Sequence, residues 1–228
     1  MNKKLLHTLS MLLLAMVAFT FTSCSLFDLD EIDGHRYVDL GLSVKWATCN
    51  VGADSPEDYG DYFAWGETKP KSTYNESTYK WYQGDSYDLT KYCTDRDYGT
   101  VDNKTQLDLS DDAAHVNWGG SWRMPTYDEW TELKEKCTWT WHRHTYYYDD
   151  EVVGYEVTSK INGNSIFLPA AGYRDDSRLF PGGYYWSSSL FTKFPFCAWS
   201  MGFDFSIAPL YARAPVRYYG LSVRPVCP

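Results

Sequence analysis

Two histidines spaced two residues apart are the first residues in this chain whose types and spacing suit metal chemistry. His142 and His144 follow a Trp-Thr-Trp run in a predicted strand. Side chains of a strand repeat every two residues, so both imidazoles would share one face and could bind zinc or copper. No third ligand accompanies them in the sequence, which favours two solvent-exposed histidines. We therefore predict no metal site and no cofactor.

Three aspartates form a second group with possible metal chemistry. Asp108, Asp111 and Asp112 could offer calcium the hard oxygen ligands that it prefers. They also stand where a short helix can begin, over Asp111–Val116, and aspartates there cap backbone N–H groups and complement the helix dipole. We favour the capping role over a calcium site.

A glutamate beside a tryptophan, Glu129 and Trp130, could be taken for a general acid. The sequence Thr126-Tyr-Asp-Glu129 is also a capping box, in which Thr126 and Glu129 satisfy each other's backbone N–H groups. That role accounts for the carboxylate without catalysis. The sequence contains no Ser-His-Asp order, phosphate-binding loop or dinucleotide fingerprint. We predict no catalytic residue and a protein that is not an enzyme.

The N-terminal residues indicate export and lipid anchoring. Lys3 and Lys4 precede an apolar run over Leu5–Phe21, and small residues lead to Cys24. This run is short for a membrane span and is typical of a signal peptide. We predict a lipoprotein signal peptide at 1–23, lipidation of Cys24 and an acidic tether at 24–34. The chain would then be held at the outer membrane or cell surface by its lipid, with a domain at 35–228.

Composition narrows the choice of partners. The net charge of −9 becomes −11 without Lys3 and Lys4, which argues against nucleic acid because its phosphates need a basic surface. Aromatic residues make up 18% of the chain, with 20 Tyr and 10 Trp, and such side chains supply rigid contact area.

The cysteines give little information about the fold or the function of the chain. No Cys-x-x-Cys pair occurs, and an odd number of cysteines after Cys24 leaves at least one thiol unpaired. These cysteines are Cys49, Cys93, Cys137, Cys197 and Cys227.

The helices and strands that would position these residues are predicted from the periodicity of apolar residues and from capping and turn residues. Trp130, Leu133 and Cys137 recur at helical spacing behind the capping box, which predicts a helix of about three turns. A second helix is expected to begin at Ser55-Pro56, and residues 68–106 read as a long ordered loop, called the long loop below. Strands are expected at 36–40, 44–51, 139–141, 152–161 and 165–168, with Asn162-Gly163 as a hairpin turn between the last two. This order indicates an α+β domain with mostly short antiparallel strands, one or two helices and long ordered loops.

Residues 190–219, called the C-terminal segment below, have no clear period. They lie between two strand-like stretches, 183–189 and 221–226, and mix Phe, Pro, Ala, Cys, Ile and Arg. No Asn occurs after Asn164, although Asn is common in turns. An irregular insert in a regular frame is typical of a scaffold that presents a variable binding surface.

Several motifs in order resemble the Fibrobacter succinogenes major paralogous domain, which is abundant in lipoproteins of Bacteroidetes. The resemblance covers nearly all of residues 35–226 and implies a C-type lectin-like fold, in the branch shared with the formylglycine-generating enzyme. The motifs that carry it are Val38–Gly52, Tyr62–Glu67, Trp118–Trp130, Phe167–Arg174, Tyr185–Ser189 and Ser222–Val226.

The resemblance implies binding more than catalysis. Proteins of this fold include the variable proteins of diversity-generating retroelements, in which Asn codons near the 3′ end of the gene are rewritten to many other residues. The C-terminal segment has that composition, so it is either diversified or part of a fixed binding module or structural, adhesive envelope component. A formylglycine-generating-type enzyme is less favoured, because its copper site needs a close cysteine pair and Cys197 and Cys227 lie far apart in the sequence. The calcium motifs of sugar-binding lectins are absent from the sequence.

We therefore expect the chain to bind a protein or glycan ligand at the cell surface through the C-terminal segment. Aromatic residues and Arg carry most of the binding energy at interfaces. The predicted contact residues are Phe191, Phe194, Phe196, Ile207, Leu210, Tyr211, Arg213, Arg217 and Tyr218.

Overall fold

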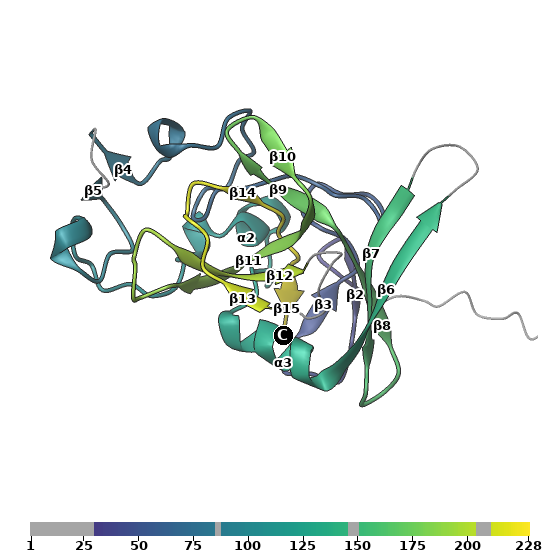
Figure 1. The fold of residues 1–228 in the computed structure, drawn as a ribbon. Coiled ribbons are helices and arrows are strands. Elements are labelled where there is room, and N and C mark those ends of the chain that lie inside the picture. The colour runs from purple at the N-terminus through teal and green to yellow at the C-terminus, as the bar shows by residue number, and fades with distance from the viewer. Residues whose placement is uncertain (1–29, 85–87, 146–150, 204–210) are drawn as a thin grey trace, which may run out of the picture.

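The computed structural model describes residues 30–84, 88–145, 151–203 and 211–228 (Figure 1). The predicted signal peptide at 1–23, Cys24 and most of the tether therefore lie outside the described residues. Within the described residues, no helix is both long enough and apolar enough to cross a membrane.

Antiparallel sheets dominate the described chain. One sheet has the order β1-β2-β3-β15 and joins the beginning of the domain to its end. A second sheet, β6-β7-β8, is a meander. A third has the order β10-β9-β11-β12-β13, with β14 also on β9, and contains one parallel pair, β9 with β11. The prediction of mostly antiparallel strands with one or two helices is confirmed for the described residues, and this arrangement is consistent with an α+β or a mostly-β fold.

The strands of the first sheet are β1 (Glu31–Ile32), β2 (His35–Val38), β3 (Lys45–Ala47) and β15 (Val226–Cys227). Those of the meander are β6 (Cys137–Thr145), β7 (Glu151–Ser159) and β8 (Ser165–Pro169). The third sheet contains β9 (Ala171–Asp175), β10 (Arg178–Phe180), β11 (Gly182–Leu190), β12 (Ala198–Phe203), β13 (Tyr211–Arg213) and β14 (Gly220–Leu221).

The long loop contains little regular structure, as predicted. Its elements are the short pair β4 (Tyr82–Gln83) and β5 (Asp88–Leu89) and the 3-10 turns η1 (Glu76–Thr78) and η2 (Arg96–Tyr98). A third 3-10 turn, η3 (Leu109–Asp111), precedes the helix α2 (Ala113–Trp118). In Figure 1 the long loop extends away from the three larger sheets on the side that carries β4 and β5.

The helix α3 (Tyr127–Lys136) confirms the predicted capping box. The Thr126 hydroxyl accepts a hydrogen bond from the Glu129 N–H at 3.2 Å, and the Glu129 carboxylate accepts one from the Thr126 N–H at 2.7 Å. Arg123 binds the same carboxylate with both terminal nitrogens. Burial alone would raise the pKa of Glu129, but these bonds outweigh it and hold the pKa below its usual range. Both oxygens of the carboxylate are thus used, by the helix start and by Arg123.

Two predicted elements differ from the structure. Residues 55–58 form a turn, not a helix, because the Asp58 carboxylate accepts from the Ser55 N–H and Gly60 then turns the chain with a positive φ. The predicted strand at 44–51 ends at Ala47, since the carbonyls of Ala47 and Thr48 turn inward to the guanidinium of Arg224. The hairpin turn at Asn162-Gly163 is confirmed between β7 and β8.

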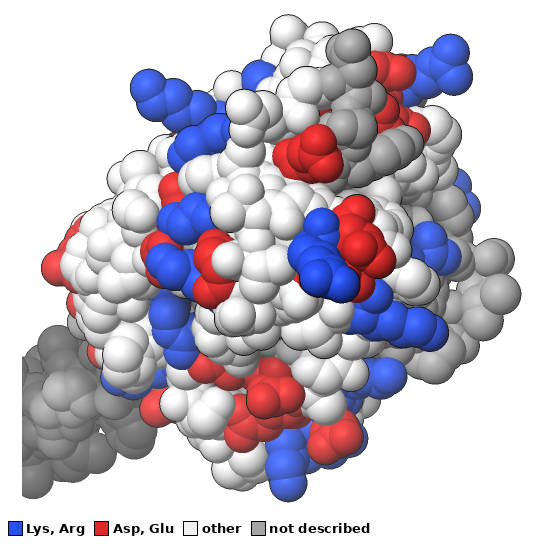
Figure 2. Space-filling model, turned by 90° about the vertical axis from the view of Figure 1, so that its left-hand side faces the viewer, with Lys and Arg blue, Asp and Glu red and all other residues white. Residues whose placement is uncertain are grey.

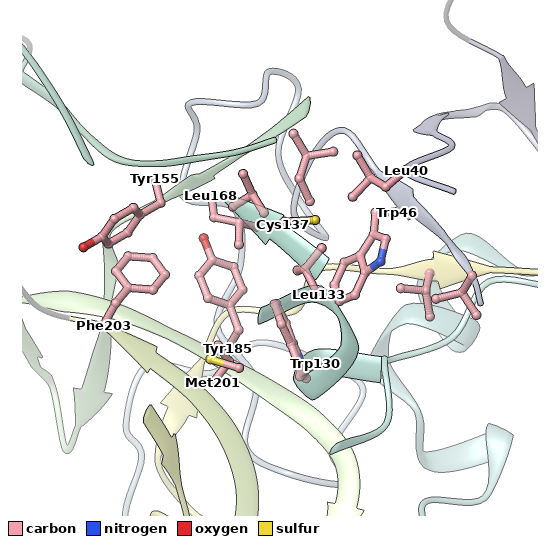
Figure 3. Close-up of a cluster of buried hydrophobic side chains, with 14 residues drawn as sticks. Leu40, Trp46, Trp130, Leu133, Cys137, Tyr155, Leu168, Tyr185, Met201 and Phe203 are labelled. Carbon is pink, nitrogen blue, oxygen red and sulfur yellow. The ribbon is translucent and has the colours of Figure 1, made fainter. Parts of the chain in front are cut away.

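The main core lies between α3, the meander and strands β3, β11 and β12 (Figure 3). Trp130 and Leu133 project from α3 into it, as the periodicity predicts, whereas Cys137 lies just beyond the helix as the first residue of β6 and is buried in the same core. The Trp130 ring packs against Trp46 at a centroid distance of 4.7 Å. The capped helix therefore ties the first and third sheets together.

All five cysteines after Cys24 are free thiols in the described residues. Cys49 is half-buried and the other four are buried. Burial raises the pKa of Cys137 and of Cys197 to about 11. These two thiols therefore stay protonated at neutral pH and serve as small apolar core residues.

We expect Leu133→Ala to lower the free energy of unfolding by about 2–5 kcal/mol, because it leaves a cavity beneath a fully buried position. Urea denaturation followed by tryptophan fluorescence measures this. Lys134→Ala, at the exposed neighbouring position, serves as the control and should change stability by less than about 0.5 kcal/mol. Equal effects of the two substitutions would show that α3 does not pack as described.

Candidate functional site

The C-terminal segment begins with a tight, phenylalanine-rich loop between β11 and β12. The Phe194 N–H donates to the Phe191 carbonyl at 3.1 Å, and the Cys197 N–H donates to the Phe194 carbonyl at 2.9 Å. Phe194 is 39% exposed, whereas Phe191 and Phe196 are half-buried. The three rings follow one another at centroid distances of 6.0 and 5.6 Å. Local hydrogen bonds thus hold an aromatic strip at the surface.

The other end of the segment returns along the third sheet towards β14. Arg213 is exposed at the end of β13, with its guanidinium 5.6 Å from the centroid of the Tyr184 ring. Ile207 and Leu210 lie outside the described residues, as does the side chain of Tyr211. Of the nine predicted contact residues, the structure therefore describes six side chains.

One of those six is wrongly predicted as a surface contact. Arg217 is fully buried. Its guanidinium donates to the Tyr79 hydroxyl at 2.8 Å and lies 4.7 Å from the centroid of the Trp65 ring. It also donates to the carbonyls of Tyr92, Pro195 and Lys91. A buried charge needs such partners, so Arg217 is a structural residue that joins the C-terminal segment to the long loop.

Phe196 and Tyr218 lie together in a cavity of about 500 Å³ between the C-terminal segment and the long loop. We call it the acidic–aromatic cavity. Its lining residues are Glu76, Asp88, Asp97, Tyr98, Phe196, Val216 and Tyr218. Burial raises the pKa of the Tyr218 phenol, with smaller contributions from Tyr219 and Glu76. The phenol therefore stays neutral at physiological pH.

A second cavity, of about 350 Å³, is also lined in part by residues 213–219. Tyrosine rings form much of its wall, and Tyr173 packs against Tyr184 and Tyr219 at 4.9 and 5.3 Å. The lining residues are Tyr173, Tyr184, Arg213, Ala214, Pro215, Tyr219 and Leu221. Residues 213–219 thus contribute to two aromatic cavities.

The sequence did not point to the residues that face the C-terminal segment across these cavities. Glu76, Asp97 and Tyr98 come from 3-10 turns of the long loop, which has no periodicity. Their only local signal is the Tyr-rich, acidic character of that loop.

A third cavity lies away from the C-terminal segment, beside β2. It has a volume of about 520 Å³, and residues near Cys49 form one wall. His35 stacks on Trp118 there at a centroid distance of 3.7 Å. The sequence did not point to this cavity either.

The aspartates considered for calcium are used by lysines and by a helix start. Asp112 caps α2 by accepting from the His115 N–H at 3.0 Å, so the capping prediction is confirmed for this residue. Lys91 binds both Asp108 and Asp111, at 2.6 and 2.5 Å. Burial alone would raise the pKa of Asp111, but hydrogen bonds from Lys91, Tyr92 and Lys80 outweigh it and hold the pKa below its usual range.

The histidine considered for zinc pairs with a carboxylate. His142 Nε2 lies 3.1 Å from Glu156 Oε2 on the neighbouring strand β7. The side chain of His144 lies outside the described residues. Across the described ranges, no three His, Cys, Asp or Glu side chains gather in an arrangement that could hold a metal ion.

Comparison of the chain with protein-family models gave no match. Comparison with curated proteins and with solved structures gave no match either.

We expect Arg217→Met to lower the free energy of unfolding by about 3 kcal/mol or more, because the Tyr79 hydroxyl and three buried carbonyls lose their donor. Arg213→Met makes the same chemical change at an exposed position and should cost less than about 1 kcal/mol. Thermal and urea denaturation of both variants test this. If Arg217→Met lowers the free energy of unfolding only slightly, Arg217 is not a structural residue and remains a predicted surface contact.

Proposed function

We propose that this chain is a lipid-anchored envelope protein that binds a protein or glycan ligand through the C-terminal segment. In this proposal Cys24 carries the anchor, residues 24–34 form the tether, and the domain has a C-type lectin-like fold. The order of motifs over residues 35–226 supports that fold, together with the mainly antiparallel sheets, the two helices among the described residues and the long ordered loop.

One observation carries the binding proposal. Residues 213–219 contribute walls to two surface cavities, of about 350 and 500 Å³, and the phenylalanine loop continues the second one through Phe196. Volumes of this size are typical of ligand sites. The C-terminal segment therefore provides both recessed and projecting aromatic surface.

The energetics of this surface favour binding. Phe194 projects from a loop whose backbone is fixed by its own hydrogen bonds, so little conformational entropy is lost when a ligand covers it. Aromatic side chains also supply large contact areas for each residue that is ordered. The buried Arg217, near the other end of the C-terminal segment, holds this segment in place by hydrogen bonds in the protein interior.

We expect Phe194→Ser to abolish binding to the ligand and to leave the melting temperature almost unchanged, because this ring is exposed. Arrays of glycans and of cell-surface proteins, probed with the purified wild-type domain and this variant, measure the loss. Tyr59→Ser is the matched control, since Tyr59 is also 39% exposed but lies outside the C-terminal segment. No ligand on either array, or equal losses in the two variants, would refute the proposal.

Diversified and fixed forms of this function differ in the gene. We expect deep sequencing of its 3′ end, in one cultured population, to show variation confined to codons within 190–219 if the segment is diversified. Codon 217 should then stay constant, because its side chain is buried. A nearby template copy and a reverse-transcriptase gene would accompany the variation. A uniform 3′ end without a template would instead establish a fixed binding module or envelope component.

A further inference from the structure

The acidic–aromatic cavity combines two features that suit a positively charged ligand. Glu76, Asp88 and Asp97 are exposed at its rim, whereas Tyr98, Phe196 and Tyr218 are half-buried in its wall. No Lys or Arg is among its lining residues in the described part of the chain. Figure 2 shows the side of the molecule that carries the long loop, where acidic and basic side chains are interspersed over uncharged surface.

The aromatic wall is assembled from segments far apart in the sequence. The Tyr98 ring lies 5.4 Å from that of Phe196, and the Tyr218 ring lies 6.4 Å from that of Tyr82. Backbone contacts join the two parts of the C-terminal segment in this wall, because the Arg217 N–H donates to the Phe196 carbonyl at 3.0 Å and Cys197 pairs with Val216 in an isolated β-bridge. The backbone that carries Phe196 and Tyr218 is therefore held in place without a ligand.

Two of the rim carboxylates are not committed to a partner within the protein. Among the described residues, neither Glu76 nor Asp97 forms an ion pair, and their carboxylates accept no hydrogen bond from another side chain or from the backbone. Other carboxylates of this region are used internally, as Asp108 and Asp111 are by lysines. The carboxylates of Glu76 and Asp97 are thus available to a ligand.

The buried positive charge of Arg217, near the aromatic wall, does not remove the preference of the cavity for a cation. Arg217 is the basic residue next to Val216 and Tyr218, but its guanidinium is covered by three carbonyls and a hydroxyl on the interior side. Three acidic residues are among the lining residues of the cavity. The whole chain is also acidic, at −9, so its field attracts a cation towards the rim.

We propose that the acidic–aromatic cavity binds a lysine or arginine side chain of a protein ligand. The apolar stem would pack against the aromatic wall, and the charged end would meet both ring faces and rim carboxylates. A cation is stabilised over the face of an aromatic ring, and an exposed ion pair adds a smaller contribution. The cavity is larger than one side chain, which leaves room for residues that flank it. This inference rests on the proposed function, because it names the ligand chemistry of the same surface.

The test uses small probes in place of the unidentified protein. Nα-acetyl-lysine methylamide and Nα-acetyl-arginine methylamide are titrated into the 15N-labelled protein, and amide shifts of Tyr98, Phe196, Val216 and Tyr218 are followed. The uncharged analogue Nα-acetyl-norleucine methylamide has the same stem as the lysine probe. We expect the two cationic probes to shift these amides with millimolar affinity and the norleucine probe to bind at least about fivefold more weakly. Equal binding of the norleucine probe would overturn the inference.

Two sets of variants test whether the cationic probes bind in the acidic–aromatic cavity. Glu76→Gln combined with Asp97→Asn should weaken the cationic probes by about tenfold, since both carboxylates lose their charge. Phe196→Leu keeps an apolar wall but removes a ring face, and should weaken them by about threefold. Glu135→Gln combined with Asp128→Asn is the matched control, because it changes the net charge equally on the distant helix α3. The same loss in the control would show that net charge alone attracts the probes, and would overturn the inference.

The proposed function and this inference can fail separately. If a protein ligand from the arrays is lost with Phe194→Ser but keeps its affinity for the Glu76→Gln, Asp97→Asn variant, the proposed function stands and the cavity inference is wrong. If an amino sugar shifts the four amides and the lysine and arginine probes do not, the occupant is a glycan and the inference is again wrong. If the probes bind as expected and the arrays show no ligand, the cavity chemistry stands without the larger proposal.

Discussion

The fold depends on a buried guanidinium, that of Arg224, which forms no ion pair with a carboxylate in the described structure. Its Nε donates to Asn50 Oδ1 at 2.9 Å, and its terminal nitrogens donate to the carbonyls of Ala47, Thr48 and Phe167. Burial lowers the pKa of Arg224. The cost of removing this charge from water is offset only while all four acceptors stay in place. One side chain near the end of the chain thus fixes β3, the turn after it and the end of the meander.

Arg217 repeats this arrangement on the other side of the molecule. It too is fully buried and donates to carbonyls and to one neutral hydroxyl. Where Arg224 holds the sheets, Arg217 holds the long loop against the C-terminal segment. The binding surface is therefore supported from within by a residue of the same segment, and the exposed Phe194 and Arg213 can differ without loss of that support.

The parts of the fold that could be predicted from sequence depend on local chemistry. The capping box at Thr126–Glu129 and the turn at Asn162-Gly163 need only near neighbours in the chain, and both are confirmed. The helix expected at Ser55 is wrong because a side chain three residues later closes a turn instead. A helix start and such a turn use the same residue types.

The binding surface could be predicted only in part, for a different reason. An arginine in a sequence does not show whether it faces solvent or a set of carbonyls, so the prediction that Arg217 is a surface contact is wrong. The partners of Phe196 and Tyr218, such as Glu76 and Tyr98, come from the long loop, about a hundred residues earlier in the sequence. No periodicity connects positions that far apart, and only the packed structure brings them together.

The pairing of β15 with β3 has a consequence for how the chain acquires its structure. Val226 pairs with Trp46, so the first sheet is completed by residues from the far end of the domain. While a ribosome is still making residues 200–220, β3 lacks a neighbour on one edge, and Asn50 lacks the guanidinium that will bind it. Contacts of such long range form slowly. The native state therefore arises only after translation of the domain is complete, and until then the chain depends on remaining unfolded without aggregating.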